Sequence, residues 1–274
     1  MTEQKNIKED NAKKNILIQP IFDNYEKYSS FAASHDLKFE IIDFALPMTL
    51  DNRDECRSRI DFYKSCENQV EFYSMHGVYN DMRLHSVDRK IREVTEERLE
   101  HNCKIARELG INKLIFHTNY VPQNSHEVYF DYWVERNADF FKKMIEKYEV
   151  EILLENVFDY FPWVLQKLME KVRGYEINVC FDIGHYNIHS RVSLREWFST
   201  LGKNIKYLHL NDNRGEKDLH AIPGTGNVKW QRLTGILKEF NLTPPAVLEV
   251  DIGNLSSLRK TLSFMREENI YPFS

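Results

Sequence analysis

The chain has few cysteines, no long apolar run and no excess of positive charge. Its four cysteines include no CxxC pair, which excludes a disulfide scaffold and indicates reduced thiols in a cytoplasmic protein. No apolar run approaches the roughly 20 residues that a transmembrane helix needs, so we expect no membrane partner. A formal net charge of −5 over 274 residues disfavours nucleic acid as the partner, although a local basic groove stays open.

Two further absences narrow the class of protein. No GxGxxG motif follows the first predicted strand, which removes the usual dinucleotide-binding fold. The polar stretch 1–14 has no apolar segment of its own, so it predicts a loose tail rather than a secretory signal. Hydrophobic residues make up 42% of the chain, enough for a sizeable core in the remainder, residues 15–274.

Short apolar segments rich in β-branched residues alternate with stretches of helical period. Eight of these segments are predicted strands, at 15–20, 38–44, 69–76, 113–118, 150–156, 177–185, 205–212 and 246–250. The clearest predicted helix ends at Gly110, and the residues that keep roughly to its apolar face are Ile91, Val94, Leu99, Cys103, Ile105 and Leu109.

This alternation predicts the fold. Apolar strands separated by helices are typical of a parallel sheet that is buried on both faces. Eight such units with no Gly-Ser linker favour a closed (β/α)8 TIM barrel over a doubly wound open sheet. We therefore predict an α/β protein with a single barrel domain over residues 15–274 and a polar tail over 1–14.

An aromatic stripe follows the fourth predicted strand. Tyr129, Trp133 and Phe140 recur at helical spacing there. Such a face packs either on the barrel or on a second copy of the chain, so a homodimer stays open.

Residues that can bind divalent ions gather at the predicted strand ends. They are His76, His117, Glu155, Asp182, His185, His209 and Glu249, followed by Asp218 and His220 in the loop after the seventh strand. A parallel barrel collects the carboxyl ends of its strands at one rim, so we expect these side chains to converge. Imidazoles and carboxylates without thiolates suit Zn, Mn, Co or Fe better than Ca.

Each of these residues also has a simpler interpretation. A single histidine in an apolar strand is commonly a hydrogen-bonded core residue, and His185 could orient a ligand from outside the metal's coordination sphere. Asp218 and His220 could instead cap their loop by ordinary turn chemistry. Buried acids are rare without a partner, so the joint pattern, rather than any one member, predicts a metal site.

Several segments resemble the xylose-isomerase-like barrel superfamily, which includes sugar isomerases, sugar epimerases and endonuclease IV. The matching segments are MHGVY, LIFHT, LLEN, VCFDIGH, YLHLND, DLHAIPGTGNVKW and VLEV, between about residues 70 and 250. FDIGH and the HLND…DLH…GTGNVKW combination are the specific elements; the others are weak by themselves.

Similarity to the sugar epimerases implies one divalent ion held by Glu155, Asp182, His209 and Glu249. Glu155 and Glu249 would also move protons on the two faces of a ketose through a metal-stabilised enediolate, with His185 as a third catalytic residue. The substrate-binding residues that this resemblance implies are His76, His117, Asn156 and Arg214, the last beside a hydroxyl or a phosphate.

Similarity to endonuclease IV implies up to three ions, because all nine metal-type positions carry the required residue type. The function would then be a multi-zinc phosphodiesterase acting on abasic DNA. The loop from His209 to Asp218 is shorter than in that family, however, and FDIGH replaces its Thr-Cys-His ending. We therefore predict an isomerase or epimerase of a sugar or sugar phosphate that uses one to three divalent ions, and keep the phosphodiesterase as the alternative.

Overall fold

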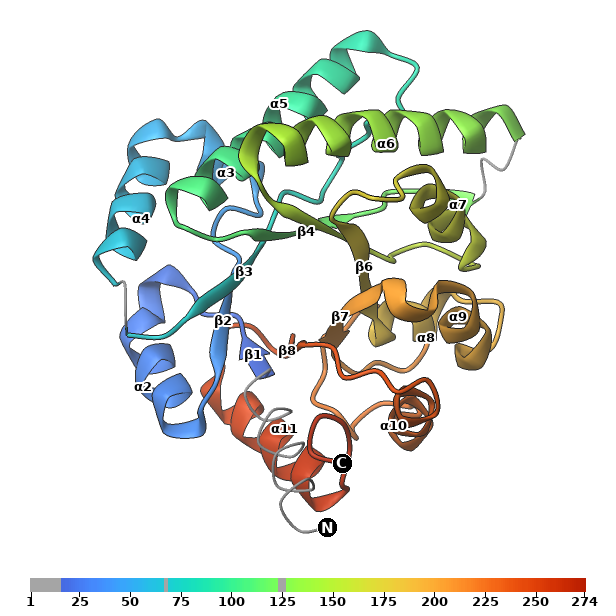
Figure 1. The fold of residues 1–274 in the computed structure, drawn as a ribbon. Helices are drawn as coiled ribbons and strands as arrows, with labels where there is room; N and C mark the ends of the chain where they lie inside the picture. Colours follow the sequence, from blue (N-terminus) through green and yellow to red (C-terminus); the bar gives the residue numbers. More distant parts are fainter. Residues whose placement is uncertain (1–15, 67–68, 123–126) are drawn as a thin grey trace.

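The computed structural model describes residues 16–66, 69–122 and 127–274, which form a closed barrel of eight parallel strands (Figure 1). The strands follow chain order around the barrel, and β8 closes it against β1. They are β1 (Ile16–Ile18), β2 (Lys38–Ile41), β3 (Phe72–His76), β4 (Lys113–His117), β5 (Glu151–Glu155), β6 (Ile177–Asp182), β7 (Ile205–Leu210) and β8 (Ala246–Leu248). Each lies inside one of the eight predicted segments, so the predicted TIM barrel is confirmed. The predicted tail, 1–14, lies outside the described residues.

Helices form the outer layer around the barrel (Figure 1). The longer ones are α2 (Tyr25–His35), α4 (Arg53–Ser65), α5 (Arg89–Glu108), α6 (Glu127–Tyr148), α7 (Trp163–Lys171), α10 (Trp230–Glu239) and α11 (Leu255–Glu267). Shorter elements are α3 (Pro47–Asp51), α8 (Ile183–His189), α9 (Leu194–Leu201) and the 3-10 turns η1 (Phe22–Asn24) and η3 (Gly202–Asn204). Among the residues described, no helix is both long enough and apolar enough to cross a bilayer.

In the first turns of helix α5, two residues of the predicted apolar face are exposed. Leu99 and Cys103 are buried, and Gly110 takes a left-handed φ of 69° just beyond the helix end, as predicted. Ile91 and Val94 are instead 45% and 52% exposed. Periodicity identifies a common face but not how far along a 20-residue helix the barrel reaches, so the first turns of this face stay exposed.

The aromatic stripe of α6 packs inward. Trp133 and Phe140 are buried, and Trp133 Nε1 donates a hydrogen bond of 3.0 Å to the carbonyl oxygen of Thr118, just beyond β4. Tyr129 is partly buried and packs against the same core. Packing on the barrel thus accounts for these aromatics without a second chain.

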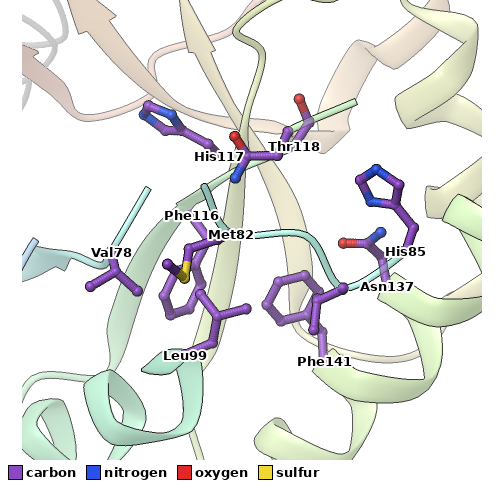
Figure 2. Close-up of a pocket in the computed structure, with 11 residues that line it drawn as sticks. Val78, Met82, His85, Leu99, Phe116, His117, Thr118, Asn137 and Phe141 are labelled. Carbon is purple, nitrogen blue, oxygen red and sulfur yellow. The ribbon is translucent and has the colours of Figure 1, made fainter. Parts of the chain in front are cut away.

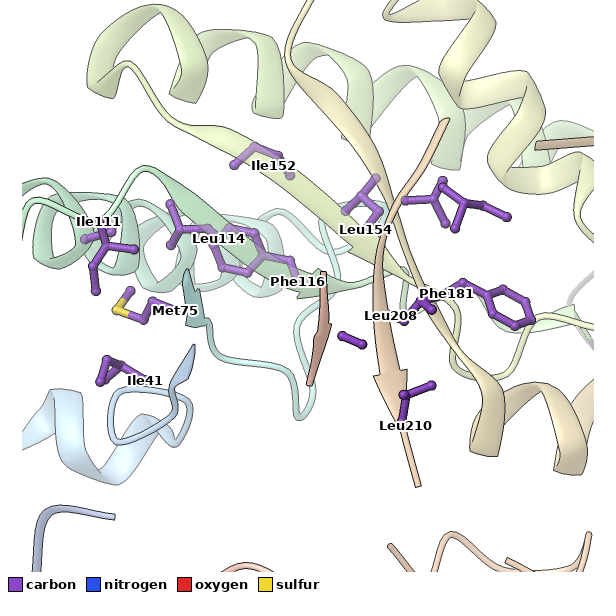
Figure 3. Packing of buried hydrophobic residues seen from close by; sticks show 14 of the residues in the cluster. Ile41, Met75, Ile111, Leu114, Phe116, Ile152, Leu154, Phe181, Leu208 and Leu210 are labelled. Carbon is purple, nitrogen blue, oxygen red and sulfur yellow. The ribbon is translucent and has the colours of Figure 1, made fainter. Parts of the chain in front are cut away.

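Side chains along each strand alternate between the helix layer and the barrel interior. Outward-facing residues such as Leu114, Phe116 and Leu154 pack under the helices in the main apolar cluster (Figure 3). A second cluster fills the interior and consists of Leu17, Ile115, Leu153, Cys180, Tyr207 and Val247. The next inward position along these strands lies at the carboxyl rim, and most of the polar residues described below occupy it.

Candidate metal centre

Strand alternation brings four predicted ligands to one point of the rim. Glu155, Asp182 and His209 each stand two residues beyond a member of the interior cluster, and Glu249 stands two beyond Val247. The strand register pairs Asp182 directly with His209. One ligand atom from each of the four residues lies within 4.8 Å of the others, and all four side chains are buried. Residues that are remote in sequence therefore meet as predicted.

The atoms in this group fit a divalent ion. His209 Nδ1 lies 3.1 Å from Glu249 Oε2 and 3.3 Å from Glu155 Oε2. Within the described part of the chain, His209 Nδ1 and Glu249 Oε2 are buried without a well-formed hydrogen bond. Buried polar atoms are seldom left without one. Three carboxylates and one imidazole are a donor set that suits Zn, Mn, Co or Fe.

Two more histidines approach Glu155 from neighbouring strands. His76 Nε2 and His117 Nε2 lie 3.2 Å and 3.4 Å from Glu155 Oε2. These three residues form a second group of the right size for an ion. Since His76 ends β3 and His117 ends β4, the predicted convergence extends across six consecutive strands.

A third group joins the helix after β6 to the loop after β7. His185 Nε2 and His220 Nε2 lie 3.2 Å and 2.9 Å from Asp218 Oδ2. His220 has a left-handed backbone with φ 44°, a conformation that costs a non-glycine residue about 1 kcal/mol or more. Its Nδ1 lies 3.1 Å from the carbonyl oxygen of Glu249. Because that contact brings the ring to the rim, turn chemistry alone does not account for this residue.

Electrostatic interactions keep most of these carboxyl groups ionised. Burial opposes ionisation of Glu155, but His209 and His117 outweigh it and hold its pKa well below the usual value. Burial likewise opposes ionisation of Glu249, and His209 and His220 still lower its pKa to about 2. Asp182 differs, because burial raises its pKa to about 6. The rim is thus a cluster of anions whose charge is offset by imidazoles.

Of the predicted substrate-binding residues, Asn156 is hydrogen-bonded to the backbone of Asp182 and Arg214 is exposed to solvent. Asn156 is buried; its Nδ2 donates to the carbonyl oxygen of Asp182, and its Oδ1 accepts from the amide of Asp182, at 3.0 and 2.9 Å. These two hydrogen bonds orient the backbone of Asp182, and a contact of Asn156 with substrate stays a prediction. Arg214 is exposed in the loop after β7, and its contact with substrate stays a prediction.

Sequence reasoning missed a buried acid on β2. Glu40 is fully buried inside the barrel, where its carboxylate contacts His209, Tyr207, Ser74 and Gln19. A carboxylate in an apolar strand needs a partner, so the Glu in KFEIIDF could have been identified in the same way as Glu155.

Asp212 also has a definite role in the polar loop after β7. Its carboxylate accepts hydrogen bonds from the amides of Gly224 and Val228, at 2.8 and 3.2 Å, and from Trp230 Nε1, at 3.1 Å. The GTGNVKW segment is therefore folded around this side chain. The motif is structural at Asp212, whereas Asp218 and His220 belong to the rim.

A pocket of about 440 Å³ opens beside the centre. His117, His185 and Asp218 reach it from the rim, and the rest of its wall includes Phe158, His189 and residues 79–83. Behind β4, a separate cavity of about 10 Å³, room for one water molecule at most, is lined by His117, Thr118, His85, Asn137 and apolar side chains (Figure 2). A small polar ligand therefore has access to the rim from the 440 Å³ pocket.

The sequence profile of the xylose isomerase-like TIM barrel family matches residues 31–268. The chain belongs to this family. Among relatives of this xylose isomerase-like barrel, the uncharacterized protein MJ1311 of Methanocaldococcus jannaschii is 24% identical over 203 residues, which are 70% of this chain and 68% of that protein.

Solved structures share the whole barrel. The TTHB071 protein of Thermus thermophilus, soaked with ZnCl2, is 22% identical with a TM-score of 0.73, covering 92% of this chain and 98% of that one. D-allulose 3-epimerase of Methylomonas sp., in complex with D-allulose, is 15% identical with a TM-score of 0.71, covering 92% and 96%. At these identities the likeness establishes the fold, and the buried His, Asp and Glu groups are consistent with a metal site.

Proposed function

We propose that this xylose isomerase-like barrel is a divalent-metal-dependent epimerase or isomerase of a sugar or sugar phosphate. The observation that carries the proposal is the group of Glu155, Asp182, His209 and Glu249, in which two buried ligand atoms have no hydrogen-bond partner among the described residues. These four residues would hold the ion. Support also comes from the fold of a sugar epimerase in complex with its ketose.

The chain's own residues would handle the protons. A bound divalent ion would polarise the substrate carbonyl and stabilise negative charge on its oxygen. Glu155 is the last residue of β5 and Glu249 directly follows β8. A carboxylate on each face of a carbon can take a proton from one side and return one to the other. His185 faces the pocket and would donate a hydrogen bond to a substrate hydroxyl, while His117 lines the wall beside it.

Solvent exchange tests this function. Purified protein should contain at least one Mn, Zn, Co or Fe per chain by elemental analysis. With Mn²⁺ in deuterated water it should introduce deuterium beside the carbonyl of at least one member of a panel of ketoses, inososes and sugar phosphates. Chelator-treated protein should lose this exchange and regain it with added metal. A panel without any exchange, on metal-loaded protein, would contradict the proposal.

The phosphodiesterase remains the second candidate because of one observation. The His76–His117–Glu155 and His185–Asp218–His220 groups offer positions for two further ions. Three metals per chain, with nicking of abasic DNA that falls steeply as salt rises, would favour it. A single metal with proton exchange and no nicking would favour the epimerase. The homodimer and the cytoplasmic location stay predictions.

A further inference from the structure

Glu40 is a fully buried carboxylate on the inner face of β2, among the side chains that pack beneath the rim. Gln19 Nε2 donates to its Oε1 at 2.9 Å, and Ser74 Oγ and Tyr207 OH donate to its Oε2 at 3.2 and 3.0 Å. On the side of the centre, its two oxygens lie 3.3 and 3.4 Å from His209 Nε2. A carboxylate this deeply buried is costly unless it is paired and hydrogen-bonded, and Glu40 has both kinds of partner.

Three other histidines of the rim, His76, His185 and His220, are anchored differently. The Nδ1 atoms of His76, His185 and His220 lie 2.8, 3.0 and 3.1 Å from the backbone carbonyl oxygens of Gly77, Asn156 and Glu249. A carbonyl only accepts hydrogen bonds, so each of these rings donates through Nδ1 and turns Nε2 toward a carboxylate. His209 has the opposite orientation: its Nε2 faces Glu40, and its Nδ1 faces Glu155 and Glu249.

A carboxylate likewise cannot donate a hydrogen bond when ionised, so Glu40 requires the Nε2 proton of His209. That leaves Nδ1 as the ring atom with a lone pair for an ion. The same network contacts a second predicted ligand, because Gln19 Nε2 also donates a hydrogen bond of 3.1 Å to Glu249 Oε1. The other oxygen, Glu249 Oε2, then faces His209.

We propose that Glu40 is a positioning residue of the metal centre, fixing the ring orientation and tautomer of His209 directly and the carboxylate of Glu249 through Gln19. This inference rests on the proposed metal centre but not on the identity of the sugar. A carboxylate behind a ligating imidazole increases its basicity, and loss of such a partner commonly lowers metal affinity about 10- to 100-fold.

The test compares zinc affinities, measured by competition with a chromophoric chelator, for the wild type, Glu40→Gln and Glu40→Leu. Gln keeps the shape and an acceptor for His209 but removes the charge, so we expect roughly tenfold weaker binding; Leu removes both, and we expect a loss closer to 100-fold. Tyr207→Phe is the matched control. It removes one hydrogen bond to the same carboxylate and leaves the His209 contact, so its affinity should stay within about threefold of the wild type.

A spectroscopic measurement separates positioning from a general loss of structure. In zinc-loaded protein with ¹⁵N-labelled histidine, His209 should give an Nε2–H proton that exchanges slowly with solvent, and this signal should disappear in Glu40→Leu. If Glu40→Leu does not fold, Glu40→Gln decides alone.

Zinc affinity of Glu40→Gln equal to that of the wild type would overturn the inference, as would a wild type that binds no divalent ion. Absence of sugar turnover would instead contradict the proposed function, and the expected order of zinc affinities would still hold.

Discussion

Glu155 is the residue at which the histidines of the rim converge. One or the other of its oxygens lies within 3.4 Å of a ring nitrogen of His76, His117, His185 and His209. A single carboxylate therefore belongs both to the four-residue group and to the group with His76 and His117. Its replacement should affect metal binding and proton transfer together.

We expect Glu155→Gln to lower turnover by at least about 100-fold, because it removes both a charged ligand and a proton-transfer group. Exchange of deuterium into the substrate and zinc affinity should both be measured. Glu151→Gln is the control: it lies on the same strand, where Glu151 accepts a hydrogen bond from Asn178 away from the rim, and it should keep near-normal rates. Wild-type turnover in Glu155→Gln would exclude the paired-carboxylate mechanism.

His85 makes stability depend on pH outside the metal centre. Burial, with a smaller effect of Arg83, lowers the pKa of His85 to about 4, and its Nε2 lies 2.9 Å from Tyr129 OH. In the unfolded chain His85 has a pKa near 6.5. Between pH 4 and 6.5 the unfolded chain therefore binds more protons than the folded one. The contribution of His85 to the free energy of unfolding is therefore fully present above about pH 6.5 and is lost as pH falls toward 4.

This predicts that the free energy of unfolding of metal-free protein falls between about pH 6.5 and 4, and that His85→Gln makes the fall shallower. Urea unfolding at several pH values measures it. The same slope in the variant and the wild type would mean that another group titrates there.

At the scale of elements, the short helix α8 begins directly after β6, whose last residue is the N-cap of the helix. Asp182 caps the helix through the amide of His185, and Asn211 Nδ2 donates to Asp182 Oδ2 at 2.8 Å. Gly184 lies against the side chain of Asn211 so closely that an added Cβ would overlap it. Gly184 is therefore needed for the close approach of Asn211, which in turn holds the predicted ligand Asp182.

We expect Gly184→Ala to weaken zinc binding about tenfold and to lower thermal stability, because Asn211 must move away from Asp182. Gly235→Ala is a matched control within α10, where an added Cβ meets no described atom within 4 Å. That change should raise stability by roughly 0.5 to 1 kcal/mol through helix propensity and leave zinc affinity unchanged. Equal zinc affinity in both variants would argue against a role for the Asn211 contact.

The strands could be predicted because each is a short apolar run, and their closure into a barrel followed from counting them. The convergence of Glu155, Asp182 and His209 followed in turn from their places at strand ends. Glu40 was missed although KFEIIDF was predicted as a strand, because the family resemblance assigns no ligand to that strand. The direction in which each ring faces depends on carbonyl and carboxylate partners remote in sequence, which periodicity does not encode.

For the whole molecule, metal binding should be linked to protons. In metal-free protein the pKa of His209 is raised well above its usual value: burial opposes this, and Cys180 and Glu249 outweigh it. The pKa of His220 is likewise raised, to about 10, by Glu249 and Asp218 against burial. An ion must displace such protons, so apparent zinc affinity should rise with pH across the neutral range.

Calorimetric titration of zinc in buffers of different ionisation enthalpy would measure the protons released, and we expect at least one per ion. Saturating zinc should also raise the midpoint of thermal unfolding, and a chelator should reverse the shift. Binding that is independent of pH, without proton release, would contradict the participation of these imidazoles.

The closure of β8 on β1 has a consequence for biosynthesis. Gln19 and Glu249 touch although 230 positions separate them, so Glu249 is made long after its partner. A nascent polypeptide still lacking this strand would carry exposed rim carboxylates and imidazoles without the arrangement that selects an ion. In the proposed metal centre, loading with an ion would therefore follow synthesis of the eighth strand rather than guide the first steps of folding.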